Sequence, residues 1–234
     1  MITSTKQVSM RPIPNILTVF RLVSPLFVLA ALMLLARPFA DWVGLSIFVV
    51  AALTDFLDGY LARWFNSFSQ LGRILDPIAD KVLVLSTGAI LLIDHAAVTN
   101  LINPMILIPF ILIMIREFTI GGVREVLAGK VALPVSWVAK VKTTMQLLAV
   151  ILLFFQPITG FRVGELTQGM DNIILQGIVA GAVEDEIGLL NAIWRANAVD
   201  VAVVIAFWVA AILAWVSGLG YLSTAIRSLK KAAT

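Results

Sequence analysis

One acidic stretch dominates this chain: Asp55-Phe56-Leu57-Asp58-Gly59-Tyr60-Leu61-Ala62-Arg63, followed by Gly72, Asp76 and Asp80. It places four carboxylates within 26 residues of a sequence that is otherwise strongly apolar. A charged side chain inside a bilayer costs about 2.5–3.5 kcal/mol on insertion scales, and neighbouring like charges resist ionising together. The cluster is tolerable only if a strong positive charge lies among the carboxylates. One or two divalent cations, held by hard oxygen ligands, would supply that charge.

The rest of the composition is that of a membrane protein. Of the 234 residues, 60% are hydrophobic and 13% are charged, and the mean hydropathy is +1.00. Soluble domains do not have such a composition, so a single membrane-embedded domain over residues 1–234 is predicted. No cysteine is present, which excludes disulfides, thiolate metal sites and a cysteine nucleophile. The single His95 excludes a histidine-rich metal site. The net charge is a modest +3, and no nucleic-acid partner is expected.

Six windows are long and apolar enough to cross a bilayer, which takes about 20 residues. They predict an all-α membrane protein built as a bundle of six transmembrane helices. Residues 1–14 are polar and predict an N-terminal interfacial lead-in. The windows are Asn15–Ala36, Val43–Ala62, Ile74–Ile93, Pro104–Val126, Ser136–Phe155 and Asp200–Tyr221.

The distribution of basic residues predicts the orientation. With both termini inside, 14 of the 17 lysines and arginines lie on the inner side, and only Arg37, Arg162 and Arg195 lie outside. This bias follows the positive-inside rule. The same orientation puts the four carboxylates at the cytoplasmic face, beside most of the basic residues.

The connection 156–199 is long for a helical bundle and is predicted to be non-cytoplasmic. Within it, residues 171–196 are apolar enough for one or two helices lying on the membrane surface. A seventh membrane segment is the alternative, although the acidic run Glu184–Glu186 argues against it.

Helical spacing predicts how the acidic stretch is arranged. Residues three and four apart share a helix face, so Asp55 and Asp58 lie on one stripe with the small residues Gly59 and Ala62. Asp76 and Asp80 share a face of the next helix, for which we expect Pro77 to lie in the first turn. Two antiparallel helices can thus direct four carboxylates into one pocket, as in a two-metal phosphoryl-transfer site.

The same residues fit the pattern D-x-x-D-G-x-x-A-R-x8-G-x3-D-x3-D, and the chain resembles the CDP-alcohol phosphotransferases at every position of it. Other segments resemble the bacterial members that make phosphatidylglycerophosphate. These segments are Pro14–Arg21, Leu75–Lys81, Ile115–Glu117, Arg124–Glu125 and Val135–Gln146. The resemblance covers nearly everything from Ile13 to Phe155 and fades in the connection 156–199.

The resemblance implies a metal-dependent transferase of phospholipid biosynthesis. It implies a six-helix membrane bundle, homodimeric, in the bacterial cytoplasmic membrane, that moves the phosphatidyl group of CDP-diacylglycerol to glycerol 3-phosphate and releases CMP. It also implies two Mg²⁺ or Mn²⁺ ions, bound by Asp55, Asp58, Asp76 and Asp80, with Asp80 as the catalytic base. By the same resemblance, Asp58, Gly59, Ala62, Arg63 and Gly72 would bind CDP-diacylglycerol.

Polar residues elsewhere complete the expected site. Asn15, Thr18 and Arg21, at the start of the first window, are expected to contact CDP-diacylglycerol, although Asn15 could instead cap its helix. An anionic acceptor such as glycerol 3-phosphate requires cations, and Arg116, Arg124, Lys140 and Lys142 are suited to hold it. The alternative for these four is contact with lipid headgroups under the positive-inside rule.

Three other functions remain open from the sequence. The same chemistry could use phosphatidylglycerol, an inositol phosphate or serine as the acceptor. A divalent-cation or proton transporter also uses intramembrane carboxylates, but it predicts carboxylates near the bilayer centre and repeated halves. A non-catalytic scaffold predicts that no metal is needed.

Overall fold

The computed structural model describes residues 12–65, 70–127 and 137–232. All the regular structure in these ranges is helical, which confirms the predicted fold class. The helices are α1 Pro12–Leu34, α2 Phe39–Phe65, α3 Gln70–Thr99, α4 Pro104–Leu127, α5 Trp137–Thr167, α6 Asn172–Val179 and α7 Leu189–Ala232.

The helices agree with a membrane bundle, although the count of six long spans is not reproduced. Five helices of the described part are long and apolar enough to cross a bilayer: α1, α3, α4, α5 and α7. The expected second span corresponds to α2, which is 27 residues long, but its apolar described stretch is the shorter Phe39–Thr54. Many large apolar side chains, such as Met33, Ile93 and Ile205, are exposed on the outside of the bundle, as lipid contact requires.

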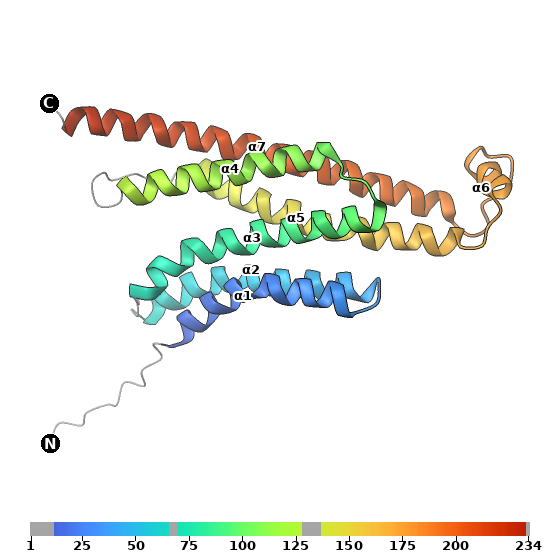
Figure 1. Ribbon diagram of the computed structural model, residues 1–234, viewed down its shortest axis with the longest axis horizontal. Helices are drawn as coiled ribbons and strands as arrows, with labels where there is room; N and C mark the ends of the chain where they lie inside the picture. The colour runs from blue at the N-terminus through green and yellow to red at the C-terminus, as the bar shows by residue number, and fades with distance from the viewer. Residues whose placement is uncertain (1–11, 66–69, 128–136, 233–234) are drawn as a thin grey trace, which may run out of the picture.

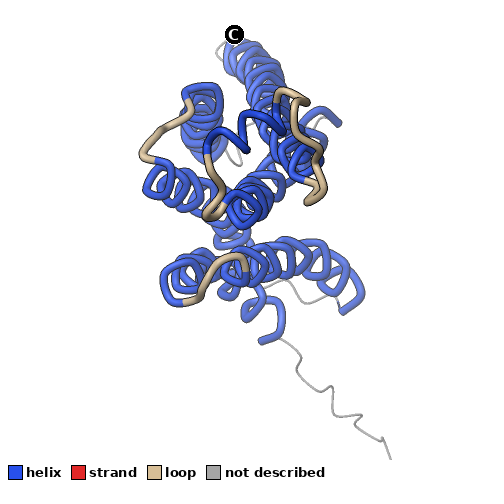
Figure 2. Tube along the Cα trace, turned by 90° about the vertical axis from the view of Figure 1, so that its right-hand side faces the viewer, coloured by secondary structure: helices blue, strands red, loops and turns tan. Residues whose placement is uncertain are grey.

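The helices pack in two groups (Figures 1 and 2). In one group α1 lies against both α2 and α3, and in the other α7 lies against both α4 and α5. Contacts of α5 with α2 and α3 join the groups. The core between them contains rings such as Phe48 and Phe154, whose centroids are 6.0 Å apart.

The two ends of the bundle differ in what they carry. At one end α1 begins, α2 ends, α3 begins and α7 ends, which is the left side of Figure 1. We call this the motif end, because the acidic stretch spans the end of α2 and the start of α3. The α1–α2 and α3–α4 connections and α6 lie at the far end. Both terminal helices therefore reach the same end as the acidic stretch, as the sequence predicts.

Ion pairs hold the far end together. Arg37, just before α2, pairs with Asp41 of α2 and with Asp94 near the end of α3. The Asp41 side chain is completely buried. A buried carboxylate needs a partner charge, so Arg37 fixes the α1–α2 connection against α3.

The expected connection 156–199 is largely helical. α5 continues to Thr167 and α7 already begins at Leu189 rather than near Asp200. Gln156 Nε2 donates to Asp200 Oδ1 at 2.7 Å, which ties the two extended helices together. Between them α6 is eight residues long, and Asp171 caps it by accepting from the Ile173 N–H at 2.8 Å. At about 12 Å in length, α6 is too short to cross a bilayer.

One expectation about α3 is wrong. Pro77 does not lie in the first turn, because α3 begins at Gln70 and Pro77 is inside the helix. Proline is tolerated inside membrane helices, where neighbouring helices compensate for the lost backbone hydrogen bond, and Pro25, Pro109 and Pro157 are also internal.

Candidate active site

Two of the four motif carboxylates, Asp76 and Asp80, face α1. The Thr18 hydroxyl donates to Asp76 Oδ1 at 2.6 Å. The Arg21 guanidinium spans both carboxylates: its NH2 lies 3.3 Å from Asp76 Oδ1, and its NH1 pairs with Asp80 Oδ1. The spacings of three residues on α1 and four on α3 bring these four side chains together across one helix contact.

Burial of this group is uneven. Arg21 is completely buried and Thr18 is 2% exposed, whereas the side chains of Asp76 and Asp80 are 44% and 43% exposed. A buried cation thus lies behind two carboxylates that open to the surface near the motif end. The positive charge of Arg21 offsets the electrostatic repulsion between the two carboxylates.

For several expected site residues, the structure describes the backbone but not the side chain. Their backbones lie in α1, at the end of α2, at the start of α3 and at the end of α4. Their side chains are outside the described part of the structure; they are Asn15, Asp55, Asp58, Gly59, Ala62, Arg63, Gly72 and Arg124. Their assigned roles therefore stay predictions.

The donor set of the described carboxylates fits a hard divalent cation. Asp76 and Asp80 offer carboxylate oxygens on one helix face and are partly exposed, and Mg²⁺ binds through one or two such groups together with substrate phosphates. No three acidic or histidine side chains gather into a metal site among those described. The other two motif carboxylates fall outside that set.

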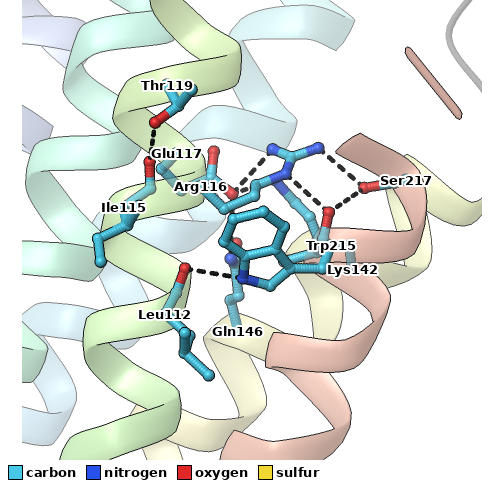
Figure 3. Close-up of polar contacts among 10 residues, drawn as sticks. Leu112, Ile115, Arg116, Glu117, Thr119, Lys142, Gln146, Trp215 and Ser217 are labelled. Carbon is cyan, nitrogen blue, oxygen red and sulfur yellow. Dashed lines mark hydrogen bonds and ion pairs between the residues drawn. The ribbon is translucent and has the colours of Figure 1, made fainter. Parts of the chain in front are cut away.

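A second polar group lies where α4, α5 and α7 meet (Figure 3). Glu117 Oε1 accepts from Arg116 NH1 at 3.1 Å, from Gln146 Nε2 at 3.2 Å and from the Lys142 ammonium. All four side chains belong to residues that are 6–7% exposed. We call these four residues the Glu117 cluster.

Arg116 also fastens α4 to α7. Its Nε donates to the Ala214 carbonyl and its NH2 to the Ser217 hydroxyl, both at 2.8 Å. The adjacent Trp215 donates from its indole nitrogen to the Leu112 carbonyl at 3.2 Å. These three hydrogen bonds satisfy polar groups inside apolar helices, where leaving them unpaired would cost several kcal/mol.

The expected acceptor-binding cations are therefore in different surroundings. Arg116 and Lys142 are buried and bonded to Glu117, while Lys140 is exposed. A guanidinium has five N–H donors and an ammonium has three. The hydrogen bonds described above therefore leave some donors of Arg116 and of Lys142 unused. An anion reaching the cluster could thus bind without breaking it.

Sequence reasoning missed Gln146 of this cluster and also Ser217, which bonds to Arg116. Gln146 is one helical turn after Lys142, a spacing that could have indicated a shared face. Ser217 lies on α7, 101 residues from Arg116, and no periodicity in either helix signals that contact.

The comparisons with known proteins agree with one another. The family model described as CDP-alcohol phosphatidyltransferase matches residues 11–217. A protein of Cereibacter sphaeroides, CDP-diacylglycerol–glycerol-3-phosphate 3-phosphatidyltransferase, is 36% identical over 222 residues, which cover 93% of this chain and 97% of that protein. Proteins of the same name from Rickettsia bellii and Sodalis glossinidius are each 41% identical, covering 60% and 62% of this chain and 74% and 78% of their own lengths.

Proposed function

Because this chain belongs to the CDP-alcohol phosphatidyltransferase family, we propose that it transfers the phosphatidyl group of CDP-diacylglycerol to glycerol 3-phosphate. The products are phosphatidylglycerophosphate and CMP. The observation that carries this is the match along 97% of the Cereibacter sphaeroides protein, whose name states that reaction. The complete acidic motif in this chain supports the same chemistry.

The reaction breaks the phosphoanhydride bond of CDP-diacylglycerol and forms a new phosphate ester bond. A hydroxyl oxygen of glycerol 3-phosphate attacks the β-phosphorus of CDP-diacylglycerol, and the bond from that phosphorus to the bridging oxygen breaks. CMP leaves with the bond's electron pair, and the hydroxyl proton passes to a base. Asp80 is the proposed base, and its 43% exposure supports access to a substrate hydroxyl.

Asp55, Asp58, Asp76 and Asp80 are the residues that would hold divalent cations. When bound, Mg²⁺ or Mn²⁺ polarises phosphoryl oxygens and neutralises the charge of the leaving group. Around them, Thr18 and Arg21 orient Asp76 and Asp80, and Arg63 follows the acidic stripe, where its fork suits phosphate oxygens. We assign Asn15, Thr18, Arg21, Gly59, Ala62 and Gly72 to the CDP-diacylglycerol side of the site.

Cations on α4 and α5 would hold the acceptor. Arg116, Arg124, Lys140 and Lys142 are proposed for this, and the spare donors of the Glu117 cluster support it. Placing these cations at the cytoplasmic face rests on the positive-inside bias. The location in the bacterial inner membrane and the homodimer rest on the family resemblance.

The site is also a poor fit to a transporter. Asp76 and Asp80 lie in the first half of α3, which begins at Gln70, rather than at its middle. A transport path requires charged groups near the bilayer centre.

Release of CMP tests the proposal. Purified protein in lipid nanodiscs receives CDP-diacylglycerol, Mg²⁺ and one acceptor at a time: glycerol 3-phosphate, phosphatidylglycerol, inositol phosphate or serine. We expect release with glycerol 3-phosphate, and none after chelation of the metal. Release only with a different acceptor would overturn the assignment, and release unaffected by a chelator would overturn the metal.

A further inference from the structure

Lys81 is a cation that the site described so far leaves unused. It follows Asp80 on α3, but successive residues of a helix point about 100° apart. Asp80 faces α1, where it pairs with Arg21, whereas the Lys81 side chain reaches α4 at Gly121. A Cβ atom placed on Gly121 would lie 2.2 Å from Lys81 Nζ and 3.4 Å from its Cε. Helix α3 therefore presents carboxylates on its α1 side and an ammonium on its α4 side.

The ammonium of Lys81 lies in a region that already has excess positive charge. Gly121, which the ammonium borders, is one helical turn after Glu117 on α4, and Glu117 already pairs with Arg116 and Lys142. Three cations thus share one carboxylate among these described residues. Lys81 itself makes no hydrogen bond or ion pair with any residue that the structure describes, apart from the backbone bonds of its helix.

Such an excess of cations in a partly buried place favours an anion. Removing a charge from water costs free energy unless an opposite charge or hydrogen bonds replace the water. Arg116 and Lys142 have Glu117 as that partner, and Lys81 has none in the described part. A group with two negative charges, such as a phosphate monoester, would balance the three cations and Glu117.

The Lys81 ammonium can lie against α4 because residue 121 is a glycine. Any side chain on Gly121 would enter the space of Lys81 Nζ. The far end of a lysine is flexible, so an added methyl group would displace the ammonium rather than separate α3 from α4. The next residue, Gly122, has no atom within 4 Å of an added Cβ. The two neighbouring glycines therefore differ in whether they border the Lys81 ammonium.

We propose that Lys81 binds the phosphate group of the acceptor, and that Gly121 is the residue that keeps its ammonium in position. The inference rests on the proposed function and deepens it. Asp80 and Lys81 are consecutive on α3 but point to different sides of it, so the acceptor would extend from its hydroxyl at the Asp80 carboxylate to its phosphate at the Lys81 ammonium. An uncharged acceptor would leave the excess of positive charge unbalanced, so Lys81 selects for an anionic one.

Steady-state kinetics with two pairs of variants test this proposal. Lys81→Met keeps the length of the side chain and removes the charge, and Lys81→Arg keeps the charge. For Lys81→Met we expect the KM for glycerol 3-phosphate to rise about 10- to 100-fold, the range of a charged hydrogen bond, with the KM for CDP-diacylglycerol unchanged. Lys81→Arg should recover part of the loss.

The glycine pair gives a control in which no charge changes. Gly121→Ala should raise the KM for glycerol 3-phosphate in the same direction as Lys81→Met, whereas Gly122→Ala should not. Alanine is the better helix former at both positions, so a general effect on α4 would appear in both variants. If Lys81→Met does not fold, the KM values for glycerol 3-phosphate of Gly121→Ala and Gly122→Ala still test the proposal.

Binding without turnover gives a second readout. Glycerol 3-phosphate, added without CDP-diacylglycerol, should raise the melting temperature of the wild type and of Gly122→Ala by mass action. Glycerol 3-phosphate should raise the melting temperatures of Lys81→Met and Gly121→Ala by a smaller amount. An unchanged KM for glycerol 3-phosphate in both of these variants, with an active wild type, would overturn the role of Lys81. A wild type that does not use glycerol 3-phosphate at all would instead overturn the proposed function.

Discussion

Arg21 lies directly behind Asp76, with its NH2 3.3 Å from Asp76 Oδ1, and it is completely buried while the carboxylate is 44% exposed. The same guanidinium pairs with Asp80. One internal cation thus serves two carboxylates that are assigned to metal binding. Arg21 stabilises the pair when no metal neutralises it.

The first prediction concerns this pair. Replacing Arg21 by methionine removes charged hydrogen bonds and should lower the free energy of unfolding by about 1–3 kcal/mol. Because Asp76 and Asp80 then lose the cation that both share, Mg²⁺ should raise the melting temperature of Arg21→Met more than that of the wild type. Equal metal-induced shifts in the two proteins would contradict the role of Arg21.

Glu117 should be important for stability. Glu117→Gln leaves Arg116 and Lys142 buried without a counter-charge, and breaking a buried pair in this way costs about 3–5 kcal/mol. Chemical denaturation in detergent measures the loss. The control is Glu165→Gln, because Glu165 pairs with Arg162 at 3.2 Å on the surface, where both side chains are at least half exposed. We expect at most about 1 kcal/mol for this exposed pair.

Ser217 should matter through the α4–α7 contact. Ser217→Ala removes the acceptor of the Arg116 NH2 bond and should lower the free energy of unfolding by about 1–3 kcal/mol. Ser223 is a matched control on the same helix, because its exposed hydroxyl donates to the Gly220 carbonyl of its own helix at 2.9 Å. If both alanine variants unfold alike, the Arg116 contact does not stabilise the bundle.

The far end should affect stability without affecting substrate binding. Arg37→Met removes the partner of Asp41, which is fully buried, and of Asp94. We expect a loss of about 3–5 kcal/mol in the free energy of unfolding and unchanged KM values for both substrates. A rise in either KM at a temperature where the variant is folded would show that the two ends are coupled.

The sequence predicts the local parts of this structure well. Spacing of four residues places Asp76 and Asp80 on one face of α3, and both do face α1 through Arg21 and Thr18. The apolar windows predict five of the long helices, because length and hydropathy are local properties. The shared end of the termini and the acidic stretch follows from an even number of crossings and from the distribution of lysine and arginine.

What depends on tertiary contacts could not be predicted. The sequence assigned Arg21 to CDP-diacylglycerol and not to the carboxylates, since the contact joins residues 55 and 59 positions apart. The start of α3 at Gln70 was missed because a proline in water usually marks a first turn, whereas Pro77 lies inside a packed membrane helix. Arg116 is expected from the sequence to bind the acceptor. Its hydrogen bond to Ser217 of α7 could not be predicted, because no pattern near either residue indicates it.

The most direct test of the central claim is the lipid product itself. Mass spectrometry would measure the phosphatidylglycerophosphate formed from CDP-diacylglycerol and glycerol 3-phosphate by the wild type and by Asp80→Asn, each with Mg²⁺ and with a chelator. We predict one phosphatidylglycerophosphate for each CMP released by the metal-loaded wild type, and none from the variant or after chelation. Equal product from Asp80→Asn, or CMP released without that lipid, would contradict the account.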